Sequence, residues 1–161
     1  MVMYKKILLT HAGTDAGDEA LKHAIHVATP SCSEILILHV VERNPYPSMF
    51  GLHMSERESI IKQIEEVSQI MREHMTNEMQ KRVQKCKEDE INASAHVVIG
   101  YPSEEIVRMV KKNEIDLVVM AKRKKLPGVK AIFKLGSMSR KILEEVSCPV
   151  LIVDAERHGR K

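Results

Sequence analysis

The segment KLGSMSRKILEEVSCPVLIV, residues 134–153, contains a step of small residues that could bind an anion. Gly136, Ser137, Met138 and Ser139 stand where the pattern predicts the start of a helix. The first backbone N–H groups of a helix have no partner within it, and the helix dipole favours negative charge there. These N–H groups and two hydroxyl groups could hold a phosphate. A helix capped by Ser137 after a turn permitted by Gly136 would explain the same residues.

Positive charge gathers just before this step. Lys122 and Lys124 belong to the run KRKK at 122–125, and Lys130 and Lys134 follow it. These cations could cover the same phosphate or contact a longer polyanion, and the alternative is a solvated loop that aids solubility. With three Tyr, two Phe and no Trp, the chain has few rings that could stack on bases. We therefore do not expect a nucleic-acid partner.

The sequence shows no residues at a familiar catalytic or metal-binding spacing. It lacks the H-E-x-x-H, G-x-S-x-G and G-x-x-x-x-G-K-[ST] motifs, and its eight His are scattered. Asp116 stands at the expected entrance of a strand, whereas ligands of parallel sheets bind at the strand exits. We expect a binding protein with no catalytic residues and no metal site.

The composition indicates one ordinary globular domain. The chain has 161 residues, of which 43% are hydrophobic and 29% charged, and its formal net charge is +3. Its three Cys form no C-x-x-C pair, which fits a reducing cytoplasm. No apolar run approaches the ~18 residues of a membrane span, and the first one is too short for a signal peptide.

Apolar runs alternate with amphipathic stretches along the chain. Buried parallel strands are predicted at 5–10, 34–41, 93–100, 115–121 and 149–153. Helices are predicted from Thr14 or Asp15 to Pro30, from Ile60 to Cys86, from Pro102 to Lys112 and over 137–147, and a loop over 42–55. This order predicts an α/β domain over 1–155, a doubly wound five-stranded parallel sheet between two helix layers, and a polar tail at 156–161.

The long helix predicted between Ile60 and Cys86 carries one continuous apolar stripe. Its members recur every three or four residues, and polar residues between them keep the other face in water. The run of Met71, Met75 and Met79 is expected to fill the core.

The order of these elements and several local strings resemble the universal stress protein family. The strings are ILLTHAGTDAGDEALKHAIHVA, ILHVVE, IDLVVMA and GSMSRKILEEVSCPVLIV, and the resemblance covers about residues 4–154 except the 42–55 loop. It implies a small cytoplasmic α/β protein of the stress response that forms a homodimer through its last strand. One branch of this family binds ATP or AMP, and another branch does not.

Several positions depart from the nucleotide-binding branch of that family. In that branch the fourth strand ends in Gly-x-x-Gly, nine residues follow, and then Gly-Ser; here Gly136 and Ser137 match the last pair. Ala121 and Lys124 stand at the other two glycine positions, and the loop is two residues longer. An Asp that helps to hold adenosine is replaced by Ala12, whereas Val40 matches a position that lines the adenine pocket. Thr10, at the end of the first strand, is one more candidate.

The resemblance and the departures together define the expected function. We expect a dimeric regulatory binding protein with an anion site at 136–139, because the N–H groups of a helix start bind phosphate without help from Ala12 or Ala121. Adenosine recognition should be weakened, because Ala12 removes an oriented acceptor. The alternative is a switch that binds ATP or AMP as its cofactor and hydrolyses ATP slowly or not at all.

Overall fold

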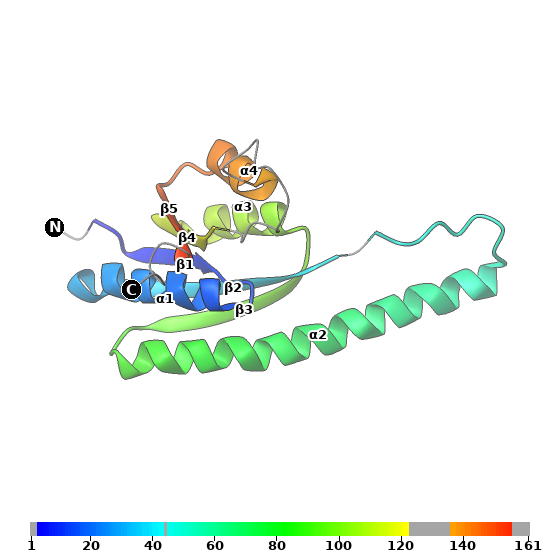
Figure 1. Ribbon diagram of the computed structural model, residues 1–161, viewed down its shortest axis with the longest axis horizontal. Coiled ribbons are helices and arrows are strands. Elements are labelled where there is room, and N and C mark those ends of the chain that lie inside the picture. The colour runs from blue at the N-terminus through cyan, green and yellow to red at the C-terminus, as the bar shows by residue number, and fades with distance from the viewer. Residues whose placement is uncertain (1–2, 44, 123–135, 156–161) are drawn as a thin grey trace.

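The computed structural model describes residues 3–43, 45–122 and 136–155, which form a parallel sheet between helices (Figure 1). The strands are β1 Lys6–Thr10, β2 Glu34–Glu42, β3 Ala93–Gly100, β4 Leu117–Ala121 and β5 Val150–Val153. The helices are α1 Asp15–Ala28, α2 Met54–Glu88, α3 Pro102–Asn113 and α4 Ser137–Glu145, with a short 3₁₀ turn at Thr29–Ser31. The α/β class and the five parallel strands predicted from the sequence are confirmed.

The strands lie side by side in the order β3-β2-β1-β4-β5. Strand β1 is central, with Leu8 beside Leu36 of β2 and beside Val118 of β4. The chain builds outward from β1 to β3 and then returns to the other side of β1 with β4. The carboxyl ends of β1 and β4 therefore flank the point where the winding reverses, which is where ligands bind in such sheets.

Alternate residues of the strands face two separate cores. Ile7 and Leu9 of β1 pack with residues of α1 and α2, including Leu21 and Met79. Leu8 packs on the opposite side, with residues of α3 and α4. Figure 1 shows these two helix layers on opposite faces of the sheet. The near-continuous apolar runs in the sequence arise because both faces of these strands are covered.

The helix ends follow the local signals in the sequence. Thr14 caps α1, and its hydroxyl accepts a hydrogen bond from the Gly17 N–H at 3.3 Å. Helix α1 ends at Ala28, just before the 3₁₀ turn that contains Pro30. Helix α3 begins at Pro102, where the missing N–H of proline costs no helical hydrogen bond.

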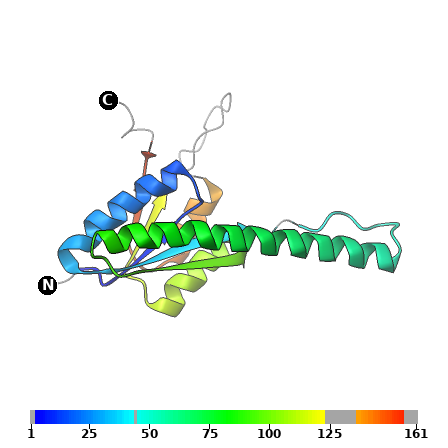
Figure 2. The same ribbon diagram turned by 90° about the horizontal axis from the view of Figure 1, so that it is seen from below.

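Helix α2 differs most from the prediction. It begins at Met54, six residues before the first residue of the predicted stripe, and its buried residues are Met79, Val83 and Cys86. The expectation that the methionines fill the core holds for Met79 and partly for Met75, but it is wrong for Met71, which is 52% exposed. The helix outruns the sheet, so its first half has no core to join (Figures 1 and 2). Despite its 35 residues, α2 is too polar to span a membrane, and no other helix in the described parts of the chain is long and apolar enough to do so.

Candidate functional site

The start of α4 lies at the carboxyl edge of the sheet. Val150, at the start of β5, pairs with Val118 near the start of β4, so the end of α4 must lie near the amino edge. Helix α4 therefore runs antiparallel to the strands and begins at the opposite edge. Lys141, in its second turn, lies 3.9 Å from Glu104 in the first turn of α3, which itself begins just after the exit of β3. The Gly136–Ser139 step is thus placed at the edge where ligands bind.

The geometry of Gly136 does not support the capping explanation of this step. Gly136, not Ser137, is the N-cap residue of α4, and it makes no side-chain cap hydrogen bond. Its φ is −69°, which any residue can adopt. A Cβ added to Gly136 would meet nothing within 4 Å. Within the described part of the chain, neither the backbone conformation nor packing requires a glycine here.

The next three residues form the first turn of α4. Ser137 and Met138 are exposed, whereas Ser139 is buried, with 8% of its surface accessible. Their backbone N–H groups belong to the turn whose donors have no helical acceptor. Backbone donors of a free helix start, next to a residue without a side chain, leave room for an anion to approach the backbone closely.

The residues expected to meet adenosine lie at the exits of β1, β2 and β4. Thr10 is the last residue of β1 and sits beside Leu38 of β2. Its position alternates with that of Leu9, so it belongs with Val40 to the sheet face that α3 and α4 cover. Ala12 is exposed, and its methyl group offers no hydrogen-bond acceptor. Ala121 ends β4 and packs against the other face, with α1 and α2.

Lys122 has a partner within the protein. Its Nζ donates a hydrogen bond to Asp154 Oδ2 at 2.9 Å, and its backbone N–H donates to the Val153 carbonyl at 2.8 Å. A phosphate would have to compete with this carboxylate for the ammonium group. Lys124, most of the 122–134 loop and the tail at 156–161 lie outside the residues that the structure describes.

A partly buried polar network, which was not predicted from the sequence, lies beside the exit of β1. His11 Nδ1 accepts a hydrogen bond from the Gly13 N–H at 3.0 Å, so the ring proton is on Nε2, which donates to Asp18 Oδ1 at 3.1 Å. Arg82 of α2 donates to both oxygens of Asp18, at 3.0 and 3.3 Å. His39 Nδ1 donates to the His11 carbonyl at 2.7 Å. The only signal in the sequence was a His directly after a strand.

Burial controls the titration of the groups in this network. It lowers the pKa of His11, although the hydrogen bond and the charge of Asp18 act in the opposite direction. Burial likewise lowers the pKa of His39 against the effect of its hydrogen bond to the His11 carbonyl. For Asp18, burial raises the pKa, but the hydrogen bonds from Arg82 and His11 outweigh this effect and lower it. The network thus holds neutral imidazoles next to an ionised carboxylate.

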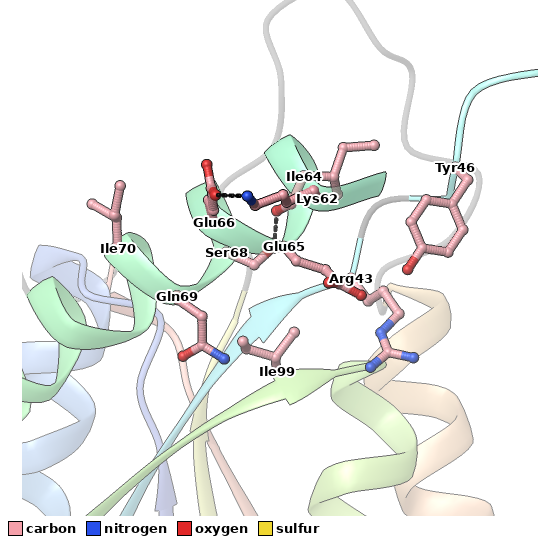
Figure 3. A pocket seen from close by; sticks show the side chains of 10 residues that line it. All are labelled: Arg43, Tyr46, Lys62, Ile64, Glu65, Glu66, Ser68, Gln69, Ile70 and Ile99. Atoms are coloured by element: carbon pink, nitrogen blue, oxygen red, sulfur yellow. Dashed lines mark hydrogen bonds and ion pairs between the residues drawn. The ribbon is translucent and has the colours of Figure 1, made fainter. Parts of the chain in front are cut away.

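A hollow of about 620 Å³ lies on the other face of the sheet from α4 (Figure 3). Arg43 and Tyr46, which follow β2, form one wall together with Ile99 of β3. The opposite wall is the first half of α2, including Ile64 and Ile70. The dashed lines in Figure 3 show that polar groups on this wall pair along their own helix, for example Lys62 with Glu66 at 3.9 Å. We therefore assign no chemistry to this hollow.

No group of three or more His, Cys, Asp or Glu in the described ranges could hold a metal ion. Asp116, at the entrance of β4, accepts hydrogen bonds from the backbone N–H groups of Lys5 and Lys6 at 2.8 and 2.9 Å. Its carboxylate therefore fastens the start of β1 at the edge away from the candidate site.

The chain is similar to known proteins over nearly its whole length. The family model described as the universal stress protein family matches residues 3–154. Universal stress protein MJ0531 of Methanocaldococcus jannaschii is 30% identical over 151 residues, covering 94% of this chain and 82% of that protein. The solved structure of protein MJ0577, from the same organism, has a TM-score of 0.76 at 26% identity and covers 95% of this chain and 97% of its own.

Two more distant solved structures contain adenine nucleotides. One is a universal stress protein in complex with cAMP, with a TM-score of 0.56 at 17% identity, covering 94% of this chain and 98% of its own. The other, from Archaeoglobus fulgidus, is in complex with dAMP, with a TM-score of 0.56 at 13% identity and the same coverage. At these identities the likeness concerns the fold. The family match over nearly all of the sequence is decisive: this chain belongs to the universal stress protein family.

Proposed function

We propose that the chain is a dimeric regulatory protein of the stress response that binds a phosphate-containing ligand without turning it over. The phosphate lies on the first turn of α4, at Gly136, Ser137, Met138 and Ser139. Adenosine recognition is weak, so the ligand is held mainly through its anionic group.

The observation that carries this proposal is the start of α4. Gly136 precedes the exposed residues Ser137 and Met138, and it has neither a positive φ nor a close neighbour in the described structure. The helix dipole adds a favourable field for an anion at this end. A glycine that the fold does not need is well explained by a ligand that must come close to the backbone.

The residues at the strand exits support weak recognition of the nucleoside. Ala12 presents a methyl group at the position where the nucleotide-binding branch of the family has the carboxylate of an Asp. Lys122, the described cation of the basic run that precedes the site, is paired with Asp154. A ligand would gain hydrogen bonds from α4 but few oriented contacts to its sugar or base, and buried polar partners provide most selectivity between nucleotides.

The second candidate is a switch that binds ATP or AMP, with slow hydrolysis or none. Thr10 and Val40 favour it, because both belong to the sheet face covered by α4, next to the winding reversal. The cAMP and dAMP complexes show that the fold can take adenine nucleotides in other proteins.

Thermal unfolding in the presence of ligands distinguishes the two candidates. A ligand at 100 times its dissociation constant stabilises the fold by about 2.7 kcal/mol, which raises the melting temperature of a chain of this size by roughly 5–10 °C. We expect a rise of only about 1–3 °C with millimolar Mg-ATP, Mg-GTP or inorganic triphosphate. A large rise specific to adenine nucleotides would support the switch, and no rise with any of them would refute an anion site.

Matched variants test whether the rise in melting temperature comes from ligand bound at the start of α4. Gly136→Ala should lower the melting temperature without ligand only modestly, because its Cβ enters open space but Ala is a poorer N-cap than Gly. It should reduce the rise with triphosphate. Ser137→Ala/Ser139→Ala should reduce the rise as well. Ser103→Ala, in the first turn of α3, is the control and should respond to triphosphate like the wild type.

The dimer forms through β5 in this proposal. Strand β5 ends the sheet beyond β4, so one of its edges has no neighbouring strand in the sheet order. The unpaired N–H and C=O groups of an open edge attract further strands. Pairing with the β5 of a second copy would provide these groups with hydrogen-bond partners in both copies at once. Sedimentation of the wild type as a monomer at micromolar concentration would refute this part of the proposal.

A further inference from the structure

Residues 54–74, the first part of α2, form an arm that extends past the sheet. A helix of 35 residues is about 52 Å long, whereas β3 beneath it has eight residues. All the buried residues of α2 lie at Met79 or beyond. Figures 1 and 2 show the arm projecting from the domain from both directions, with the segment before α2 following it to the tip.

The arm carries its own apolar face. Ile60, Ile64, Val67 and Met71, which we call the arm seam, are spaced by four, three and four residues. This average of about 3.5 residues is the spacing by which two helices pair in a coiled coil. Val67 and Met71 are 57% and 52% exposed, and Ile70 beside them is 66% exposed.

The arm seam and the buried stripe of α2 point in different directions. At about 100° per residue, the arm seam is turned by about 90° around the helix from Met79, Val83 and Cys86. One helix cannot place both sets on the same sheet. The arm seam therefore faces sideways from the core of its own chain. Ile60 and Ile64 are partly covered there, whereas Val67 and Met71 are exposed and need another surface to be buried.

The arm seam has a symmetric spacing, so it can pair with the arm seam of a second copy. Ile60 and Met71 are equally far from the midpoint between Glu65 and Glu66, and so are Ile64 and Val67. A second arm placed antiparallel across a two-fold axis at this midpoint sets Ile60 opposite Met71 and Ile64 opposite Val67. Such an isologous contact uses the same patch on both copies. Ile61 and Ile70, at the two flanks of the arm seam, obey the same symmetry.

The charges of the arm are compatible with this pairing. Most of them lie more than about 90° from the arm seam and remain in water when it is covered. These residues are Glu58, Lys62, Glu65, Glu66, Arg72 and Glu73. Glu56 and Arg57 alone flank the arm seam, near the tip of the arm, where they stay at the rim.

We propose that the arm is a docking surface for the arm of a second copy of this chain, paired antiparallel through the arm seam. This contact is independent of β5, which lies at the other end of the sheet order and away from the arm (Figure 1). With two different isologous contacts, the protein forms a tetramer if the symmetry closes and longer assemblies if it does not.

The mass in solution tests the proposal. Val67→Glu/Met71→Glu should halve the mass measured by sedimentation or light scattering, because it buries four carboxylates in the paired seam, opposite Ile64 and Ile60 of the other copy. Both side chains are exposed in the single chain, so its circular dichroism should stay native. Gln69→Glu/Gln80→Glu, which adds the same charge at exposed positions away from the arm seam, is the control and should keep the wild-type mass. An unchanged mass for the seam variant overturns the proposal, whether the arm then meets a different protein or nothing.

Cross-linking tests the antiparallel register. In a Cys32→Ser background, a chain with Ile60→Cys should form a disulfide with a separate chain carrying Met71→Cys. Neither chain should cross-link to itself, because two copies of residue 60 would be about 16 Å apart along the antiparallel pair. Disulfides within each single variant, and none in the mixture, would indicate parallel arms and overturn the proposed register.

Discussion

His11 Nε2 donates to Asp18 Oδ1 at 3.1 Å, and this bond ties the loop after β1 to the first turn of α1. Arg82 of α2 holds the same carboxylate, so one polar cluster joins three elements next to the candidate site. Because the other ring nitrogen of His11 accepts the Gly13 N–H, the ring cannot gain a proton without losing that hydrogen bond. The conformation of the Ala12–Gly13 loop therefore depends on a neutral His11. In the nucleotide-binding branch of the family, this loop carries the Asp that Ala12 replaces.

The stability of the protein should fall as the pH drops below about 6.5. A His in the unfolded chain titrates near 6.5, whereas burial lowers the pKa of His11 and of His39 in the native state. Between these values the unfolded state binds more protons, so the free energy of unfolding rises with pH. Urea unfolding from pH 5 to 8 measures this slope. His11→Gln should flatten it, and His26→Gln, at an exposed position of α1, should not.

Gly17→Ala should destabilise the protein, although Ala usually stabilises a helix interior relative to Gly. A Cβ on Gly17 would lie 2.7 Å from His11 Cε1 and 2.8 Å from its Nδ1, and the ring is held by hydrogen bonds on both nitrogens. The expected loss is about 1–3 kcal/mol, as for other overpacked cores.

The same change in a His11→Ala background should cost nothing or add stability, because the obstructing ring is absent. The interaction energy from this double-mutant cycle, measured by urea unfolding, isolates the contact. A loss of equal size in both backgrounds would show that the helix itself, and not His11, rejects the side chain.

The alternation of strands and helices could be read from the sequence because each strand is covered on both faces. The apolar run around Leu36, for example, needs partners in two cores, and only a parallel α/β sheet supplies both. Element ends marked by Thr14, Pro102 and the Gly136 step were predicted within a few residues, since caps and prolines act locally.

The parts that could not be predicted depend on contacts far apart in the chain. Val67 and Val83 follow the same helical spacing, yet one is exposed and the other buried, because the spacing does not reveal where the sheet ends. The bond from Arg82 to Asp18 spans 64 residues and leaves no pattern in either helix. The candidate site was approximated from its local helix start, whereas the pairing of Lys122 with Asp154 required the register of β4 and β5.

The three cysteines should react with an aromatic disulfide reagent at very different rates. Cys32 is exposed and should react first, whereas Cys148 is partly covered and should follow. Cys86 is buried, and burial raises the pKa of its thiol to about 11, so little thiolate forms at neutral pH. It should react only in denaturant. Absorbance traces in buffer and in urea give the number of thiols that react in the folded and in the unfolded protein. A third thiol that reacts fast in buffer would show that the packing of α2 around Cys86 opens readily.

Ile152→Pro should produce a folded chain that no longer dimerises through β5. The Val118 N–H bonds to the Pro149 carbonyl and the Lys122 N–H to the Val153 carbonyl, so these odd-numbered residues of the β5 segment face β4. Backbone groups alternate in direction along a parallel strand, which turns the N–H of Ile152 toward the open edge. Proline there removes a donor at the proposed interface but none of the bonds to β4.

Two controls separate the backbone effect from the side-chain effect. Ile152→Ala shortens the side chain and keeps the N–H, so it should still dimerise, whereas Leu151→Pro removes a bond to β4 and should unfold the edge of the domain. Sedimentation gives the assembly state, and circular dichroism gives the fold. Because the arm seam can also join copies, the comparison is best made in the Val67→Glu/Met71→Glu background, where β5 is the remaining proposed contact. If Ile152→Pro keeps the mass of that background, β5 is not the interface.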